Sequence, residues 1–198
     1  MAVNEMELVI DESDDSVTNR LLGIIGIIGA PMLFVEMLTR ALMSQPEKLN
    51  TQVVGILGIF YIGGWIATAI GMRRMRTTGN SPASKIVFVI QIVGLVLAFL
   101  YSVQETLRIT DKVNSLFFTV TDFAYPFSHA FMFIVGVLVW RTQILKGFAK
   151  FAPFFVALML PLFFALSAFG SSALVPVIAS GLAATGFVII SLAVFKRN

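Results

Sequence analysis

The sequence contains no cysteine and a single histidine, His129. The absence of cysteine excludes disulfides, thiolate metal ligands and cysteine nucleophiles. One imidazole cannot hold a haem between two histidines, and the histidine clusters of intramembrane zinc or di-iron enzymes are absent. The sequence therefore predicts no metal site and no cofactor.

Charged residues are also scarce: they make up 13% of the 198 residues, against roughly a quarter in soluble domains, whereas 58% are hydrophobic. All lysines lie in predicted loops or tails, so none could form a retinal Schiff base in mid-membrane. Phosphate-binding loops, the Gly-x-Ser-x-Gly elbow and potassium-filter sequences are missing. We predict no catalytic residues, and a non-enzymatic protein is favoured over an intramembrane enzyme. The basic residues form no stripe with aromatics, so we expect no nucleic-acid partner.

Long apolar runs, in contrast, dominate the chain. A helix needs about 20 apolar residues to cross the hydrocarbon core, and six such windows occur, with Glu36 and Asp122 the only charges inside them. They cover residues 21–39, 51–72, 86–104, 116 or 121 to 140, 151–169 and 173–195. The sequence predicts an all-α integral membrane protein, a six-transmembrane-helix bundle formed by residues 20–198 within the lipid bilayer.

The basic residues predict how this bundle is oriented. Ten of the fourteen lysines and arginines lie in the N-terminal tail, the second and fourth loops and the C-terminal tail. Basic residues in short loops stay on the cytoplasmic side, so we expect a multi-pass protein of the cell membrane with both termini cytoplasmic and residues 40–50, 105–120 and 170–172 external. Residues 1–19 carry six acidic and no basic residues, which is unlike a signal peptide and predicts a disordered cytoplasmic leader.

Small residues predict the faces on which the helices contact one another. Gly23, Gly26 and Gly29 lie three residues apart, so a neighbouring helix can approach closely there. The second and third spans carry similar stripes of small and polar residues (Gly58, Tyr61, Gly64, Thr68 and Gly71; Gln91, Gly94, Ala98, Tyr101, Glu105 and Arg108). The small residues of 179–186 predict that the sixth span is central. The fifth span is the most lipid-like, and Pro161 should kink it.

Ionisable residues gather near the predicted outer face. Glu36 and Glu105 lie towards the outer ends of the first and third spans, Asp122 lies at the head of the fourth, and His129 lies about 10 Å deeper. An ionisable group inside the membrane costs a few kcal/mol unless it has a partner, so these side chains should meet. The predicted ligand-binding residues are Glu36, Tyr101, Glu105, Asp122, Tyr125 and His129.

Each of these residues also has a purely structural interpretation. Asp122 could cap the N-terminus of the fourth span, with Pro126 tolerated in its first turns. Glu36 and Glu105 could form helix-end ion pairs with the arginines one turn further along their own helices. His129 could be a buried imidazole bonded to a backbone carbonyl.

Two functions follow from these observations. The first is a permease-like or ligand-binding protein whose outward-facing recess takes a small solute or lipid-like ligand. Glu36 and His129 would exchange protons in it, because carboxyl and imidazole groups can change protonation near neutral pH, and Tyr101 and Tyr125 would orient the ligand. The alternative is a non-catalytic accessory or assembly subunit of a membrane complex, or a homo-oligomer, whose glycine-lined faces dock other helices.

Overall fold

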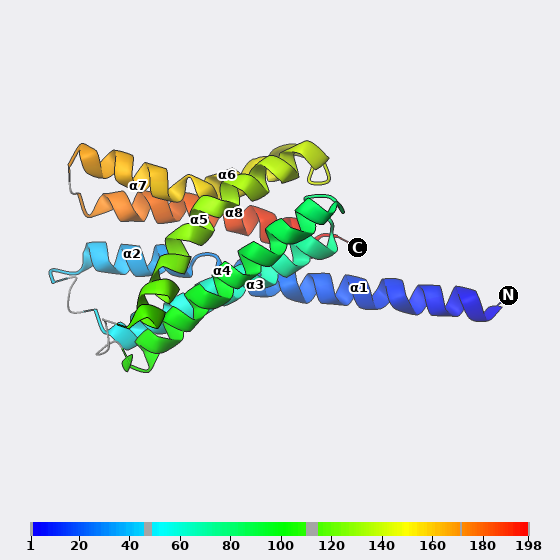
Figure 1. Cartoon of the computed structure of the whole chain (residues 1–198), viewed down its shortest axis with the longest axis horizontal. Coiled ribbons are helices and arrows are strands. Elements are labelled where there is room, and N and C mark those ends of the chain that lie inside the picture. Colours follow the sequence, from blue (N-terminus) through cyan, green and yellow to red (C-terminus); the bar gives the residue numbers. More distant parts are fainter. Residues whose placement is uncertain (1, 46–48, 110–114, 171, 198) are drawn as a thin grey trace.

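The computed structural model describes residues 2–45, 49–109, 115–170 and 172–197, with side chains from Ser16 onward. In these residues it is all-helical (Figure 1). The helices are α1 (Ala2–Gly29), α2 (Met32–Leu42), α3 (Thr51–Arg74), α4 (Pro82–Thr106), α5 (Leu116–Thr142), the short 3-10 helix η3 (Gly147–Phe151), α6 (Ala152–Ala157), α7 (Met159–Ala168) and α8 (Leu174–Phe195). Five spans are long and apolar enough to cross a membrane, and the bent segment from η3 to α7 makes a sixth if it counts as one span. The chain is a polytopic membrane protein.

Two of the spans are interrupted, and proline lies at or near both breaks. The span Ser16–Leu42 turns at Ala30 and Pro31, between α1 and α2. The fifth span bends by 53° at Leu158, three residues before Pro161. Proline has no N–H to donate to the carbonyl four residues earlier, and its ring crowds that carbonyl. The kink predicted from Pro161 is therefore confirmed.

Polar side chains at the N-terminal ends fix the start of three spans. Asn50 accepts a hydrogen bond from the backbone of Gln52 in α3, and Ser81 and Ser115 do the same for α4 and α5. Such caps satisfy backbone N–H groups that have no partner within the helix. Because Ser115 caps α5, the interpretation of Asp122 as the cap is wrong: Asp122 lies inside the helix.

The acidic segment before residue 20 belongs to α1 in this structure. Figure 1 shows the first turns of α1 extending beyond the other helices, on the side where α8 ends. The division into a leader and a membrane domain stays a prediction, as does the cytoplasmic location of the two ends. Lys48 and Lys112, which the orientation argument counts, lie outside the described residues.

The glycine face of α1 forms close helix contacts, as predicted. A Cβ added to Gly23 would lie 2.6 Å from Phe195 of α8, and one added to Gly29 would lie 2.8 Å from Gly64 of α3. At Gly26 it would overlap the side chains of Thr68 and Ser191, which hydrogen-bond to each other at 2.8 Å. Close approach of this kind supplies the van der Waals contact that holds membrane helices together.

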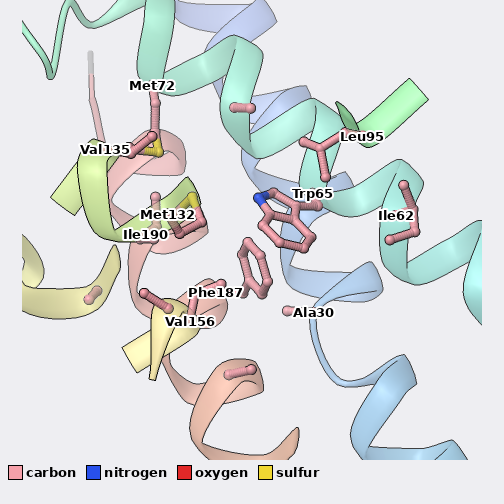
Figure 2. Packing of buried hydrophobic residues seen from close by; sticks show 14 of the residues in the cluster. Ala30, Ile62, Trp65, Met72, Leu95, Met132, Val135, Val156, Phe187 and Ile190 are labelled. Atoms are coloured by element: carbon pink, nitrogen blue, oxygen red, sulfur yellow. The ribbon is translucent and has the colours of Figure 1, made fainter. Parts of the chain in front are cut away.

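The last helix is central, also as predicted. α8 contacts α1, α2, α3, α6 and α7, and its Ala179, Ala183 and Ile190 are fully buried. Figure 2 shows the core beside it, where the Phe187 ring of α8 lies against Trp65 of α3. Small residues on α8 allow five helices to reach it.

The fifth span is lipid-like only in its second half. Phe164 of α7 is 66% exposed, as expected for a lipid-facing side chain. In α6, however, Ala152 and Val156 are fully buried, and Phe154 packs against Gly136 of α5. The bend at Leu158 changes the direction of the helix, so one half of the span can pack inside the bundle while the other faces outward.

Candidate functional site

A cavity of about 270 Å³ opens between α2, α3, α4, α5 and the start of α7. It lies at the end of the bundle where α2 and α4 end and α3 and α5 begin. Of the six predicted ligand-binding residues, five line it: Glu36, Tyr101, Glu105, Asp122 and Tyr125. The sequence-based expectation that these side chains meet is therefore met for five of the six, whereas their role in binding stays a prediction.

The carboxylates of the cavity come from three different helices. Glu36 of α2 is 7% exposed, and its Oε1 accepts a hydrogen bond of 3.0 Å from Nε of Arg40, so the predicted helix-end pair is present. Glu105 of α4 is half-buried, and Asp122 of α5 is exposed at the rim. The second predicted pair is wrong, because Arg108 turns away and donates to Gln52 Oε1 at 3.1 Å.

His129 lies behind the cavity wall rather than on it. It is fully buried, and its Nδ1 lies 3.1 Å from the carbonyl oxygen of Val156 in α6. A carbonyl can only accept, so Nδ1 carries the proton. Nε2 lies 3.2 Å from the Tyr61 hydroxyl, which must donate to it in the neutral imidazole. The backbone-bonded interpretation of His129 is thus correct, and Tyr61, which lines the cavity, connects the histidine to it.

Aromatic rings surround this connection. The Tyr61 and Tyr125 ring centroids are 6.3 Å apart, and Tyr125 lies edge-on to His129 at 4.9 Å. Trp65 also packs against the imidazole, with the two ring centroids 4.7 Å apart, and against Phe187. The imidazole is therefore held in one orientation by rings as well as by two hydrogen bonds.

The Tyr125 hydroxyl is the least satisfied polar group of the site. It is buried, and it forms no hydrogen bond with the residues that the structure describes. The Tyr61 oxygen donates its proton to His129 and could still accept from Tyr125, but the two hydroxyls form no hydrogen bond. A buried polar atom without a partner is uncommon in folded proteins. This oxygen has almost no accessible surface, so a ligand in the cavity could bond to it only after a small shift of the neighbouring side chains.

Sequence analysis missed Tyr61, Arg40 and Ser102, which also line the cavity. Tyr61 had a signal: it belongs to the stripe of small and polar residues on the second span, although it is far larger than its neighbours Gly58 and Gly64.

The described side chains do not form a metal centre. In that part of the chain no group of three histidine, aspartate or glutamate side chains is close enough to bind one ion. Comparison of the chain with protein-family models, with curated proteins and with solved structures gave no match. Any function must therefore be argued from the cavity itself.

Proposed function

We propose that this membrane protein binds a small solute in the cavity between α2, α3, α4 and α5 and couples its binding to movement of a proton. One observation carries the proposal. All three tyrosines of the chain, and every carboxylate whose side chain is described, line this one cavity. A charged residue inside a membrane helix costs about 2.5–3.5 kcal/mol at the helix centre, so gathering several around a void favours a binding role over a packing role.

The hydrogen bonds of His129 suggest how a proton could be coupled to the ligand. In the neutral imidazole, Nε2 accepts from Tyr61. A proton added to Nε2 would turn it into a donor, and the Tyr61 O–H would have to rotate away from it. Tyr61 lines the cavity. With neutral His129 its hydroxyl can only accept a hydrogen bond from a ligand, whereas with protonated His129 its O–H is free to donate one. Binding and protonation would thus influence each other, as linkage requires.

The predicted orientation gives the site a direction. The cavity lies at the end of the bundle where α2 and α4 end and α3 and α5 begin. The distribution of basic residues predicts that residues 40–50 and 105–120, and with them this end of the bundle, are external. We therefore propose that the solute enters from outside the cell.

The accessory-subunit alternative is favoured by the short loops and the absence of catalytic motifs. It also expects glycine-lined faces that dock helices of another protein. Gly23, Gly26 and Gly29 contact α3 and α8 of the same chain, so these faces are occupied. A binding function is the better explanation of the remaining polar residues.

The proposal is tested by filling the cavity. Leu57 lines it, whereas the neighbouring Ile56 is 45% exposed on the outside of α3. A panel of small amines, carboxylates and sugars would be screened by thermal unfolding of the purified protein in detergent. We expect a panel member to stabilise the wild type and Ile56→Trp but not Leu57→Trp. A panel without any stabilising member, or one whose hits also stabilise Leu57→Trp, would refute a solute site in this cavity.

Coupling is tested on the same hit after reconstitution. Proteoliposomes containing a pH-sensitive dye should change their internal pH when the solute is added to wild-type protein. His129→Ala should bind the solute but lose the pH change. A pH change that persists in this variant would exclude His129 as the coupling group.

A further inference from the structure

The charge and shape of the cavity identify the class of solute. This inference rests on the proposed function and deepens it. Three carboxylates and one guanidinium line the cavity, and the guanidinium of Arg40 is already bonded to Glu36. Glu105 and Asp122 form no ion pair with any residue that the structure describes. With all four groups ionised the wall has a net negative charge, which favours a cation.

The geometry favours an organic cation over Ca²⁺ or Mg²⁺. Ca²⁺ and Mg²⁺ need several oxygen ligands within about 2.6 Å, and no described group of three carboxylates can converge in that way. The three carboxylates instead lie on three helices around a void of about 270 Å³. That volume is slightly below the roughly 300 Å³ at which pockets for drug-sized molecules begin, so the ligand is small.

Aromatic rings supply the second half of the recognition. Tyr61, Tyr101 and Tyr125 bring three electron-rich rings to the cavity from α3, α4 and α5. A cation within about 6 Å of such a ring is attracted by its quadrupole, and the attraction grows when water is excluded. The rings give a positive charge a favourable environment that a carboxylate would not gain from.

The Tyr125 hydroxyl adds a preference among cations. It is buried without a partner among the described residues, and its oxygen can accept a hydrogen bond. A protonated amine with N–H groups can donate to that oxygen and to a carboxylate at the same time. The cavity also has an apolar wall, formed in part by Leu33, Ile62 and Met159, against which a hydrocarbon group could pack.

We infer that the cavity binds a small protonated organic amine. The ammonium group lies between Glu105 and Asp122, where a small shift of the Tyr125 ring would bring its hydroxyl into contact, and the hydrocarbon part lies deeper, against Tyr61 and Met159. Asp122, exposed at the rim, is the first charge that an entering cation meets.

The test uses three probes that share one ring and differ in charge: benzylamine, benzyl alcohol and benzoate. Their binding to the full-length protein in detergent would be measured calorimetrically at neutral pH. Benzylamine should bind at least about tenfold more tightly than benzyl alcohol, as a charge-assisted hydrogen bond implies, and benzoate should not bind. Equal binding of benzylamine and benzyl alcohol, tighter binding of benzoate, or no binding of benzylamine would overturn the inference.

Variants locate the effect in the cavity. Asp122→Asn and Glu105→Gln should each weaken benzylamine binding by about tenfold and leave benzyl alcohol unchanged. Arg108→Gln is the control, because it changes one charge at the same end of α4 but does not line the cavity. It should alter benzylamine binding by less than about twofold, since exposed charges are screened by salt. If Arg108→Gln strengthened benzylamine binding by as large a factor as Glu105→Gln weakened it, the charges would act through a diffuse field instead of a local contact. That result would refute the assigned position of the ammonium group.

These outcomes separate the inference from the proposed function. If benzyl alcohol or benzoate binds and Leu57→Trp abolishes that binding, the cavity is a solute site but the solute is not an amine. If no member of the wider panel binds, the proposed function itself fails.

Discussion

Replacing Tyr61 with phenylalanine should destabilise the protein, although the ring is retained. The variant removes the O–H that donates to His129 Nε2. Tyr61 is 2% exposed and His129 is fully buried, so water is not available to replace the lost donor. The imidazole would keep its bond to the Val156 carbonyl but leave one buried acceptor unsatisfied.

The size of the effect follows from the burial. An unsatisfied buried group costs about 1–3 kcal/mol in soluble proteins. Hydrogen bonds between membrane helices contribute less, on average about 0.6 and at most about 1.7 kcal/mol, because a membrane-embedded unfolded state also finds partners. We therefore expect Tyr61→Phe to lower the free energy of unfolding by about 1 kcal/mol.

Tyr125→Phe is the matched control. It makes the same chemical change on a ring 6.3 Å away, but the hydroxyl it removes has no hydrogen-bond partner among the described residues. Removing an unsatisfied buried polar group should leave stability unchanged or raise it. The pair of variants thus separates the loss of a hydrogen bond from the loss of a hydroxyl.

Both variants would be unfolded in mixed micelles with an increasing fraction of denaturing detergent, followed by circular dichroism. A double-mutant cycle between Tyr61→Phe and His129→Leu should give a coupling energy of about 1 kcal/mol. Equal stability of Tyr61→Phe and Tyr125→Phe, or effects that add within about 0.3 kcal/mol in the cycle, would refute the bond between Tyr61 and His129.

Two further predictions concern packing and orientation. Gly26→Ala should lower the free energy of unfolding by about 1–3 kcal/mol, because the added Cβ overlaps side chains of α3 and α8. Gly63→Ala is the control: its Cβ meets one atom at 3.8 Å, so the variant should be tolerated in the same assay. If both variants unfold alike, the glycine face does not form the contact. Single cysteines at the exposed positions Ser44 and Asn80 test the topology in a chain that has no other cysteine. In intact cells an impermeant thiol reagent should label Ser44→Cys and not Asn80→Cys, and the reverse pattern would place the cavity on the cytoplasmic side.

The sequence predicted the helices well because membrane helices carry strong local signals. Five of the six apolar windows correspond to the five long spans, and the window at residues 151–169 corresponds to the bent segment. The glycine face of α1 and the kink at Pro161 were also predictable, since each depends on residues next to one another in the chain. Hydrophobicity, small residues and proline act within a single helix, so one sequence is enough to read them.

The details of the site depended on contacts between helices and were harder to predict. The spacing along α5 placed His129 beneath Asp122, but it could not show that Tyr61 of α3 stands between the imidazole and the cavity. Likewise, Glu105 and Arg108 have the spacing of a helix-end pair, yet Arg108 donates a hydrogen bond to Gln52 of α3. In both cases a side chain of another helix competes with the local partner, and spacing within one helix contains no information about it.

The placement of Val156 links the candidate site to the bend in the fifth span. Val156 lies two residues before the break at Leu158, where the Pro161 ring prevents regular helical bonding. Its carbonyl is held by His129, and His129 is held by Tyr61 at the cavity wall. Met159, the first residue after the break, lines the same cavity. A ligand that moves Tyr61 would therefore act on both sides of the break, and a bent helix can change its angle more readily than a straight one. We therefore expect that loss of the His129 bond to Val156 changes the angle between α6 and α7 more than it changes the position of any other helix. Distances between spin labels on α6 and α7, measured for wild type and His129→Ala, would show this change.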